Sequence, residues 1–315
     1  MALSAGSPPR DGTPQAPDAT NWLLISLLGV IWGAAFLSVR VALDGYGPWT
    51  VVAGRTGIGA LVLCLVGAAM GQGPAQLSQS GPRAWPFAIV IGLLGLAIPQ
   101  TLLAFGQQYV PSAFAGIAMG MIPLLVLPLA WAFTPEEGIG PRRVAGMVLG
   151  FVGLVLLVGN GALADSGPYA TFGRFACLAA AACYATGSII TRRAPPVAPI
   201  ALASATLLAA AVPLVPLALW FEGLPQIAGP RPTLGLLYAA LLPTALAAVI
   251  RVRVIKSAGS VFMSLTSYMV PVWAVIFGIL LLGEDLPPQL FAALGLILAG
   301  IAISQSRALA GLWRR

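Results

Sequence analysis

The chain has 315 residues, of which 59% are hydrophobic and only 8% are charged. A soluble globular protein carries about 25% charged residues, so this chain has too few charges to cover a water-facing surface. The composition predicts an integral membrane protein. The net charge of +7 then fits the excess of Lys and Arg on one side of a membrane better than it fits nucleic-acid binding.

Residues 1–20 are rich in Pro, Gly, Ser and Ala and have no apolar core, which predicts a flexible cytoplasmic tail and not a signal peptide. After this tail, the chain contains apolar segments long enough to cross a bilayer as helices. We predict an all-α integral membrane protein with ten transmembrane helices, separated by short connections. The expected spans, first to tenth, are 21–41, 49–70, 84–105, 112–133, 144–160, 172–191, 199–221, 233–250, 260–282 and 288–306.

The distribution of Lys and Arg predicts the orientation of the spans. Basic residues concentrate in the loops and ends that share a side with the N-terminus, for example at Arg142, Arg143 and Lys256. The other side holds fewer of them, such as Arg40. By the positive-inside rule, both termini face the cytoplasm.

Several motifs occur twice, once in each half of the chain. Pro123 precedes the acid Glu136 by the same spacing that separates Pro271 from Glu284, and IWGAAFLSVR at 31–40 aligns with CYATGSIITR at 183–192. A unit of five spans is inverted in the membrane when it is repeated. We predict two inverted five-helix repeats, 21–160 and 161–306, followed by a basic tail at 307–315, with a substrate site where the repeats meet near mid-membrane.

These motifs resemble those of the EamA-type transporters of the drug/metabolite transporter (DMT) superfamily. The resemblance rests on the Trp32-Gly33 pair, the proline-to-acid spacing and the Gly-rich fifth and tenth spans. It departs from the pattern at Tyr184-Ala185, where the first half has Trp32-Gly33. Within the superfamily the chain is similar to YddG-type amino-acid exporters.

The resemblance implies a bacterial inner-membrane protein that exports small metabolites by alternating access through a central cavity. Neutral or aromatic amino acids are the expected substrates. Drugs, sugars or nucleosides are the alternatives within the superfamily, and a channel is a further alternative, although no filter motif is present.

Prolines interrupt matched spans in the two halves. Pro99 lies in the third span and Pro243 in the eighth, while Pro123 lies in the fourth and Pro271 in the ninth. Because the interruptions recur, we predict that these four residues act as hinges or gates. The alternative is that proline is simply common in membrane helices.

Polar and aromatic side chains inside the spans are the candidate substrate contacts. Amides and hydroxyls suit the amino and carboxylate groups of an amino acid, and aromatic rings suit an apolar side chain or an ammonium group. For each residue the alternative is packing or hydrogen bonding between helices. The predicted substrate-binding residues are Trp32, Gln100, Thr101, Tyr184, Ser188, Thr244, Ser264, Tyr268 and Trp273.

None of the nine acids lies deep in a predicted span. Carriers driven by protons or sodium ions usually hold a carboxylate at depth, so we predict uncoupled facilitated diffusion or exchange. Arg55 is the basic residue furthest inside a span. We interpret it as extending to the outer interface, with attraction of a substrate carboxylate as the alternative.

Other chemistry is excluded or weakly indicated. The chain has no histidine, and Cys64, Cys177 and Cys183 lie in apolar runs, so we expect packing cysteines, no metal site, no cofactor and no enzyme activity. Glycines of the fifth and tenth spans predict close helix packing or a homodimer contact. These glycines are Gly146, Gly150, Gly295 and Gly300.

Overall fold

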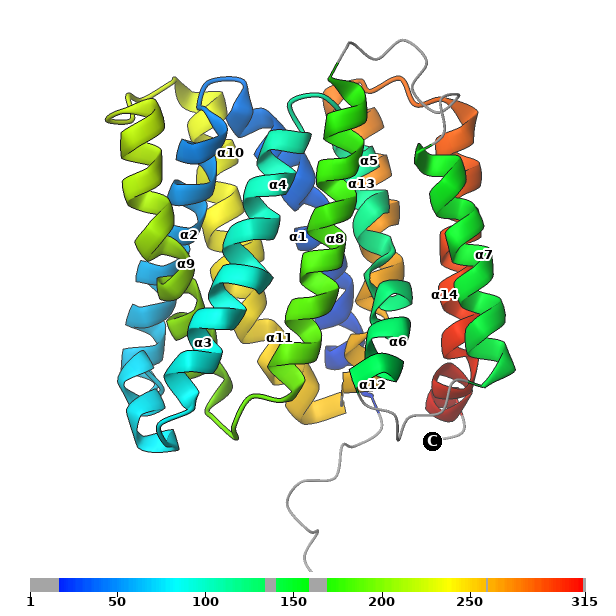
Figure 1. Ribbon diagram of the computed structural model, residues 1–315, viewed down its shortest axis with the longest axis horizontal. Helices are drawn as coiled ribbons and strands as arrows, with labels where there is room; N and C mark the ends of the chain where they lie inside the picture. Colours follow the sequence, from blue (N-terminus) through cyan, green and yellow to red (C-terminus); the bar gives the residue numbers. More distant parts are fainter. Residues whose placement is uncertain (1–16, 134–139, 159–168, 259, 314–315) are drawn as a thin grey trace, which may run out of the picture.

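The computed structural model describes residues 17–133, 140–158, 169–258 and 260–313, and all regular elements within these ranges are helical. The helical spans within these ranges lie side by side in one bundle (Figure 1). Nine of the described helical segments are long and apolar enough to cross a membrane, and α13 is a shorter apolar helix. The predicted all-α fold is therefore confirmed.

Among the described residues, six of the predicted spans are single helices and four are interrupted. The single helices are α1 (Ala19–Leu43), α2 (Pro48–Ala69), α7 (Pro141–Val158), α8 (Ala170–Arg192), α9 (Pro199–Glu222) and α14 (Pro288–Trp313). The interrupted spans are α3 (Ala84–Gly92), η2 (Leu93–Ala97) and α4 (Ile98–Gly106); α5 (Ser112–Gly120) and α6 (Ile122–Phe133); α10 (Pro230–Ala240), η4 (Leu241–Leu246) and α11 (Ala247–Ala258); and α12 (Ser260–Met263) and α13 (Thr266–Leu282). A short 3₁₀ helix, η1 (Pro74–Ser80), lies in the connection before α3.

Local sequence signals fix several helix ends. The Asp18 carboxylate accepts a hydrogen bond from the Asn21 backbone N–H at 2.8 Å and caps α1. Proline occupies the first turn of α2, α9 and α10, where its missing N–H costs nothing. Gly283 ends α13 in the left-handed conformation, with φ of 64°.

Three pairs of packed helices each join a span to its counterpart in the other half of the chain. α2 packs against α9, α5 against α13, and α7 against α14. Figure 1 shows α2 and α9 at one end of the bundle and α7 and α14 at the other. We call the face that holds the N-terminal end of α1 and the C-terminal end of α14 the termini face, and the face that holds the C-terminal end of α1 and the N-terminal end of α8 the opposite face (Figure 1).

Glycines allow α7 and α14 to approach closely. A Cβ atom on Gly146 would collide with the Gly300 carbonyl, and one on Gly150 would collide with the Leu124 side chain. A Cβ on Gly300 would lie 2.6 Å from the Gly146 carbonyl oxygen. These three predicted packing glycines therefore serve contacts within one chain, whereas Gly295 faces open space.

Candidate functional site

The third and eighth spans carry matching π-helical segments. In the third span η2 ends just before Pro99, and in the eighth span Pro243 lies within η4. A π turn changes the backbone hydrogen-bond register, and such turns are frequent at functional sites. The proline pattern predicts an interruption at both places, but it does not reveal the π geometry.

Side chains from three helices hold the kink of the eighth span. Proline has no N–H, so the usual bond from position 243 to the Ala239 carbonyl is absent. The Thr244 hydroxyl donates to that carbonyl instead, at 2.9 Å. The indole N–H of Trp32, on α1, donates to the Pro243 carbonyl at 3.1 Å.

Arg55, on α2, completes this junction. Its Nε donates to Thr244 Oγ1 at 3.2 Å. Gly59, one turn further along α2, makes room for Thr244, because a Cβ at position 59 would lie 2.7 Å from Thr244 Cγ2. The interpretation that Arg55 extends to the outer interface is therefore wrong, because its side chain reaches the middle of the eighth span.

Tyr184 approaches the same junction from the second half of the chain. Its phenol and the Arg55 guanidinium lie near enough to interact electrostatically. We call the group of Trp32, Arg55, Tyr184 and Thr244 the junction. The structure thus brings together three predicted site residues and adds Arg55 to them.

The kink of the third span is held differently. Gln100 is only 4% exposed, and its Oε1 atom has no hydrogen-bond partner among the described residues. The Thr101 hydroxyl donates to the Ala97 carbonyl of its own span at 2.8 Å. Here α8 contacts the kink through backbone, since a Cβ on Gly187 would lie 2.7 Å from Gly95 Cα.

Ser188 and Ser264 do not join the junction through their hydroxyl groups. Ser188 donates to the Ala185 carbonyl of its own helix at 2.8 Å. Ser264 donates to Gln305 on α14 at 3.1 Å. Their hydroxyls therefore have partners elsewhere.

Tyr268 and Trp273 both lie on α13. The Tyr268 hydroxyl is buried without a partner in the described part of the chain. The Trp273 ring stacks on Phe277, with ring centroids 5.4 Å apart, and its Cβ lies against Gly33 of α1. Trp273 thus helps to pack α1 on α13.

Breaks also occur in the fourth and ninth spans. The α-helical hydrogen-bond pattern is interrupted at Met121, just before Pro123, and at Ser264 and Leu265, before Pro271, while Met121 and Leu265 keep right-handed helical dihedral angles. Pro271 itself lies within α13 and contacts the other span, because a Cβ on Gly120 would lie 2.9 Å from its Cγ. Both breaks are candidates for bending.

Two carboxylates on the opposite face cap helices of the other half. Glu222, at the end of α9, accepts from the backbone N–H groups of Trp49 and Thr50 at 2.9 and 2.8 Å. Glu284, after α13, accepts from those of Ser112 and Ala113 at 2.6 and 3.1 Å. The matching acid Glu136 lies outside the described residues. Sequence spacing drew attention to Glu284 but gave no sign of either capping role.

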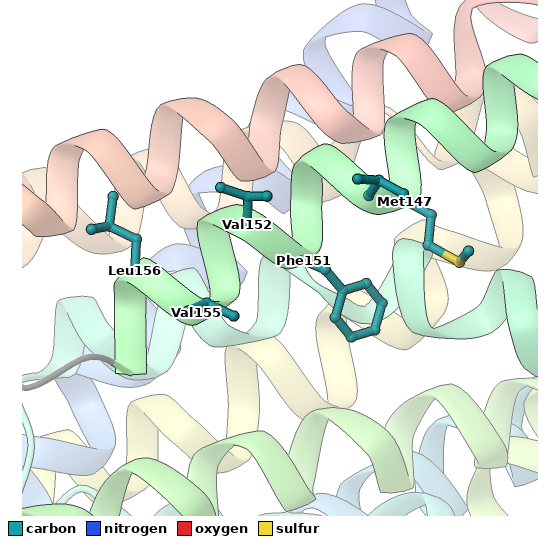
Figure 2. A pocket seen from close by; sticks show the side chains of 6 residues that line it. Met147, Phe151, Val152, Val155 and Leu156 are labelled. Carbon is teal, nitrogen blue, oxygen red and sulfur yellow. The ribbon is translucent and has the colours of Figure 1, made fainter.

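A groove of about 550 Å³ lies along α7 (Figure 2). It is lined entirely by apolar side chains of that helix, including Met147, Phe151 and Val155. Val155 is 70% exposed, as expected for a side chain that contacts lipid. A groove without polar groups suits an acyl chain, so we do not assign it to a polar metabolite.

Comparison with known proteins agrees with this architecture. The model of the EamA-like transporter family matches residues 20–159 and again residues 171–305. A solved crystal structure has the same fold, with a TM-score of 0.66 and 23% sequence identity over 93% of this chain and 99% of that chain.

Two relatives are named as transporters. A probable terminal-alkyne amino-acid exporter of Streptantibioticus cattleyicolor is 28% identical and aligns with 91% of this chain and 94% of its own length. The uncharacterized inner membrane transporter YedA of Escherichia coli is 26% identical over 88% of this chain and 87% of its own. The chain therefore belongs to the EamA-like transporter family of the DMT superfamily, and it is a multi-pass membrane transporter, not an enzyme.

Proposed function

We propose that this transporter exports small metabolites, namely neutral or aromatic amino acids, and that the substrate binds at the junction. The observation that carries the proposal is that Trp32 and Arg55, from two other spans, donate hydrogen bonds to Pro243 and Thr244 of the interrupted eighth span, while Tyr184 interacts electrostatically with Arg55. A relative that aligns along most of the chain is named as an amino-acid exporter, which supports the same substrate class.

The chemistry of the junction suits an amino acid. The guanidinium of Arg55 offers donors to a carboxylate. Gln100 lies outside the junction, in the third span, and its Oε1 atom, which has no partner among the described residues, offers an acceptor to an ammonium group. The rings of Trp32 and Tyr184 offer apolar and π surfaces to the side chain of the substrate.

Alternating access follows from the repeat architecture. The proposed hinges are Pro99, Pro123, Pro243 and Pro271, since proline removes a backbone hydrogen bond from a helix and its ring clashes with the carbonyl four residues earlier. With the predicted orientation, the termini face is cytoplasmic. The caps made by Glu222 and Glu284 then hold the two halves together on the external side. Opening toward the outside requires these caps to separate.

The proposed transport is uncoupled. The described acids Asp18, Asp44, Glu222, Glu284 and Asp285 all lie at helix ends or in connections. An ion-coupled carrier needs a group within the membrane that binds and releases the ion. The substrate gradient is then the driving force.

Uptake into proteoliposomes tests this proposal. Radiolabelled phenylalanine is offered with and without an imposed pH gradient, and unlabelled amino acids, sugars and nucleosides are offered as competitors. We expect uptake that ignores the gradient and is inhibited by other neutral amino acids. Uptake that requires the gradient would refute the uncoupled mechanism, and competition by sugars or nucleosides alone would refute the substrate class. Single-channel currents would indicate a channel instead.

A substitution at Gln100 tests the site. Gln100→Met keeps the length of the side chain but removes the unpaired acceptor, so we expect the KM for phenylalanine to rise by roughly tenfold, the equivalent of about 1.4 kcal/mol. Gln108→Met is the matched control, because Gln108 is an exposed glutamine just after the same span. Unchanged transport in the Gln100 variant would remove this residue from the site.

A further inference from the structure

Arg55 is a cationic side chain inside an apolar span without an acidic partner. In the described part of the chain its one hydrogen bond goes to Thr244, and no carboxylate pairs with it. A charge removed from water is costly unless it is paired. An ionisable residue within a membrane span is therefore a candidate for function.

The geometry fixes how the guanidinium is held. Thr244 donates to the Ala239 carbonyl and accepts from Arg55 Nε, so one hydroxyl ties the arginine to the backbone of η4. This bond uses a single N–H of the guanidinium and leaves the donors on Nη1 and Nη2. Those two groups form the planar fork that binds a carboxylate with two parallel hydrogen bonds.

None of the described neighbours of Arg55 supplies a negative charge, so a bound substrate would have to provide it. The group that interacts electrostatically with Arg55 is the phenol of Tyr184, on α8. A phenol is neutral at physiological pH, so it does not balance the charge of the guanidinium. Gly59 keeps α2 and η4 close, so the arginine is held against the kink of the eighth span.

We infer that Arg55 is the residue that selects substrates by their carboxylate group, with Thr244 as the residue that positions it. This inference rests on the proposed function, since it assigns one end of the substrate within the same site. It restricts the substrates to small carboxylate-bearing metabolites and excludes the corresponding amines, amides and esters. The rival explanation is that Arg55 only supports η4.

A matched set of ligands tests the inference. Unlabelled phenylalanine, phenylalaninamide, phenethylamine and 3-phenylpropionate compete against labelled phenylalanine in proteoliposomes. In the wild type we expect phenylalanine and 3-phenylpropionate to compete, and the two compounds without a carboxylate to compete roughly tenfold less well or worse, as expected for a lost hydrogen bond to a charged group. Equal competition by phenylalanine and its amide would overturn the inference before any variant is made.

Variants distinguish the two possible roles of Arg55, which are selection of a substrate carboxylate and structural support of η4. Arg55→Gln is expected to lose the preference for phenylalanine over its amide, Arg55→Lys to keep part of it, and Thr244→Val to weaken it. Arg231→Gln is the control, because Arg231 is an exposed arginine in the first turn of α10 and its replacement removes the same charge. If the Arg55→Gln protein binds all four ligands less well by the same factor, Arg55 only supports η4 and the inference is wrong. If the Arg55→Gln variant does not fold, the same comparison is made with Arg55→Lys and Thr244→Val. An unchanged preference for phenylalanine over its amide in both of these variants would overturn the inference.

A binding measurement separates this inference from the proposed function. If the wild type transports no amino acid, the proposed function fails. The thermal stability of the purified protein is then measured with 3-phenylpropionate and with 3-phenylpropionamide. Stabilisation by the acid alone, lost in Arg55→Gln but kept in Arg231→Gln, supports carboxylate recognition without amino-acid transport. Equal effects of the acid and the amide in the wild type overturn it.

Discussion

The kinks of the third and eighth spans are built from the same elements but are held in different ways. In the eighth span, side chains of α1 and α2 donate hydrogen bonds to Pro243 and Thr244. In the third span, the contact with α8 is glycine against glycine, and the buried Oε1 of Gln100 has no partner in the described part of the chain. A repeated fold therefore does not impose repeated contacts.

The difference assigns different tasks to the two kinks. Hydrogen bonds from neighbouring helices oppose local opening, whereas few such bonds favour it. We expect the eighth span to be the fixed side of the substrate site and the third span to be the side that moves. Departure from the repeat explains part of this difference: the Trp32 indole donates to the Pro243 carbonyl, whereas Tyr184, the counterpart of Trp32, makes no hydrogen bond to the third span in the described part of the chain.

The largest expected effect concerns the glycine contact of the third span. Gly187→Ala places a methyl group 2.7 Å from Gly95 Cα, and backbone cannot rotate away as a side chain can. We expect the free energy of unfolding to fall by about 1–3 kcal/mol, measured by thermal unfolding in detergent. Gly295→Ala is the control, since nothing lies within 4 Å of a Cβ at that position, and the better helix propensity of alanine should raise stability slightly. Equal effects of the two substitutions would contradict the close contact.

A threonine pair compares the two kinks directly. Thr244→Val removes the acceptor of the Arg55 bond and the donor to the Ala239 carbonyl, so we expect a loss of about 2 kcal/mol in the free energy of unfolding. Thr101→Val removes only a hydrogen bond between the Thr101 hydroxyl and the Ala97 carbonyl of the same span. We expect the free energy of unfolding to fall by less than about 0.5 kcal/mol, because no contact with another helix is lost. Similar losses in both variants would mean that Arg55 contributes nothing to the stability of the eighth span.

The smallest expected effect comes from the aromatic pair. Trp32→Phe keeps an aromatic ring but removes the donor to the Pro243 carbonyl. We expect the free energy of unfolding to fall by about 0.6 kcal/mol, which is typical of a hydrogen bond between membrane helices. Tyr184→Phe removes a hydroxyl that makes no hydrogen bond in the described part of the chain, so its stability should match that of the wild type. A larger loss in the Tyr184 variant than in the Trp32 variant would reverse the comparison.

The sequence predicts the spans well because lipid demands long apolar helices, and such runs are local features. Prolines predict the interruptions near Pro99, Pro123 and Pro243, which are local features as well. They are not a sufficient signal, because the uninterrupted helix α9 contains Pro213 and Pro216, and Pro271 lies within α13. The partner of Arg55 is not predictable in this way, since Thr244 is separated from it by 189 residues and only helix packing brings them together. Capping by Glu222 and Glu284 also depends on contacts between the halves.

Polar residues within spans are the least predictable group. A hydroxyl that donates to its own helix, as in Thr101 and Ser188, has the same sequence signature as one that faces a neighbour, as in Thr244. The direction of each side chain follows from the rotation of the helix in the bundle. For this reason the sequence selected Ser264, whose hydroxyl is bonded to α14, together with residues of the junction.

Amide hydrogen exchange tests the comparison of the two kinks most directly. The intact protein in nanodiscs is labelled in deuterated buffer, and exchange is compared between peptides that cover 93–101 and 241–247, with and without phenylalanine. We predict faster exchange in the third span and protection of that span by the substrate, with little change in the eighth. Equal exchange in the two spans, or faster exchange in the eighth, would contradict the assignment of one fixed and one moving side.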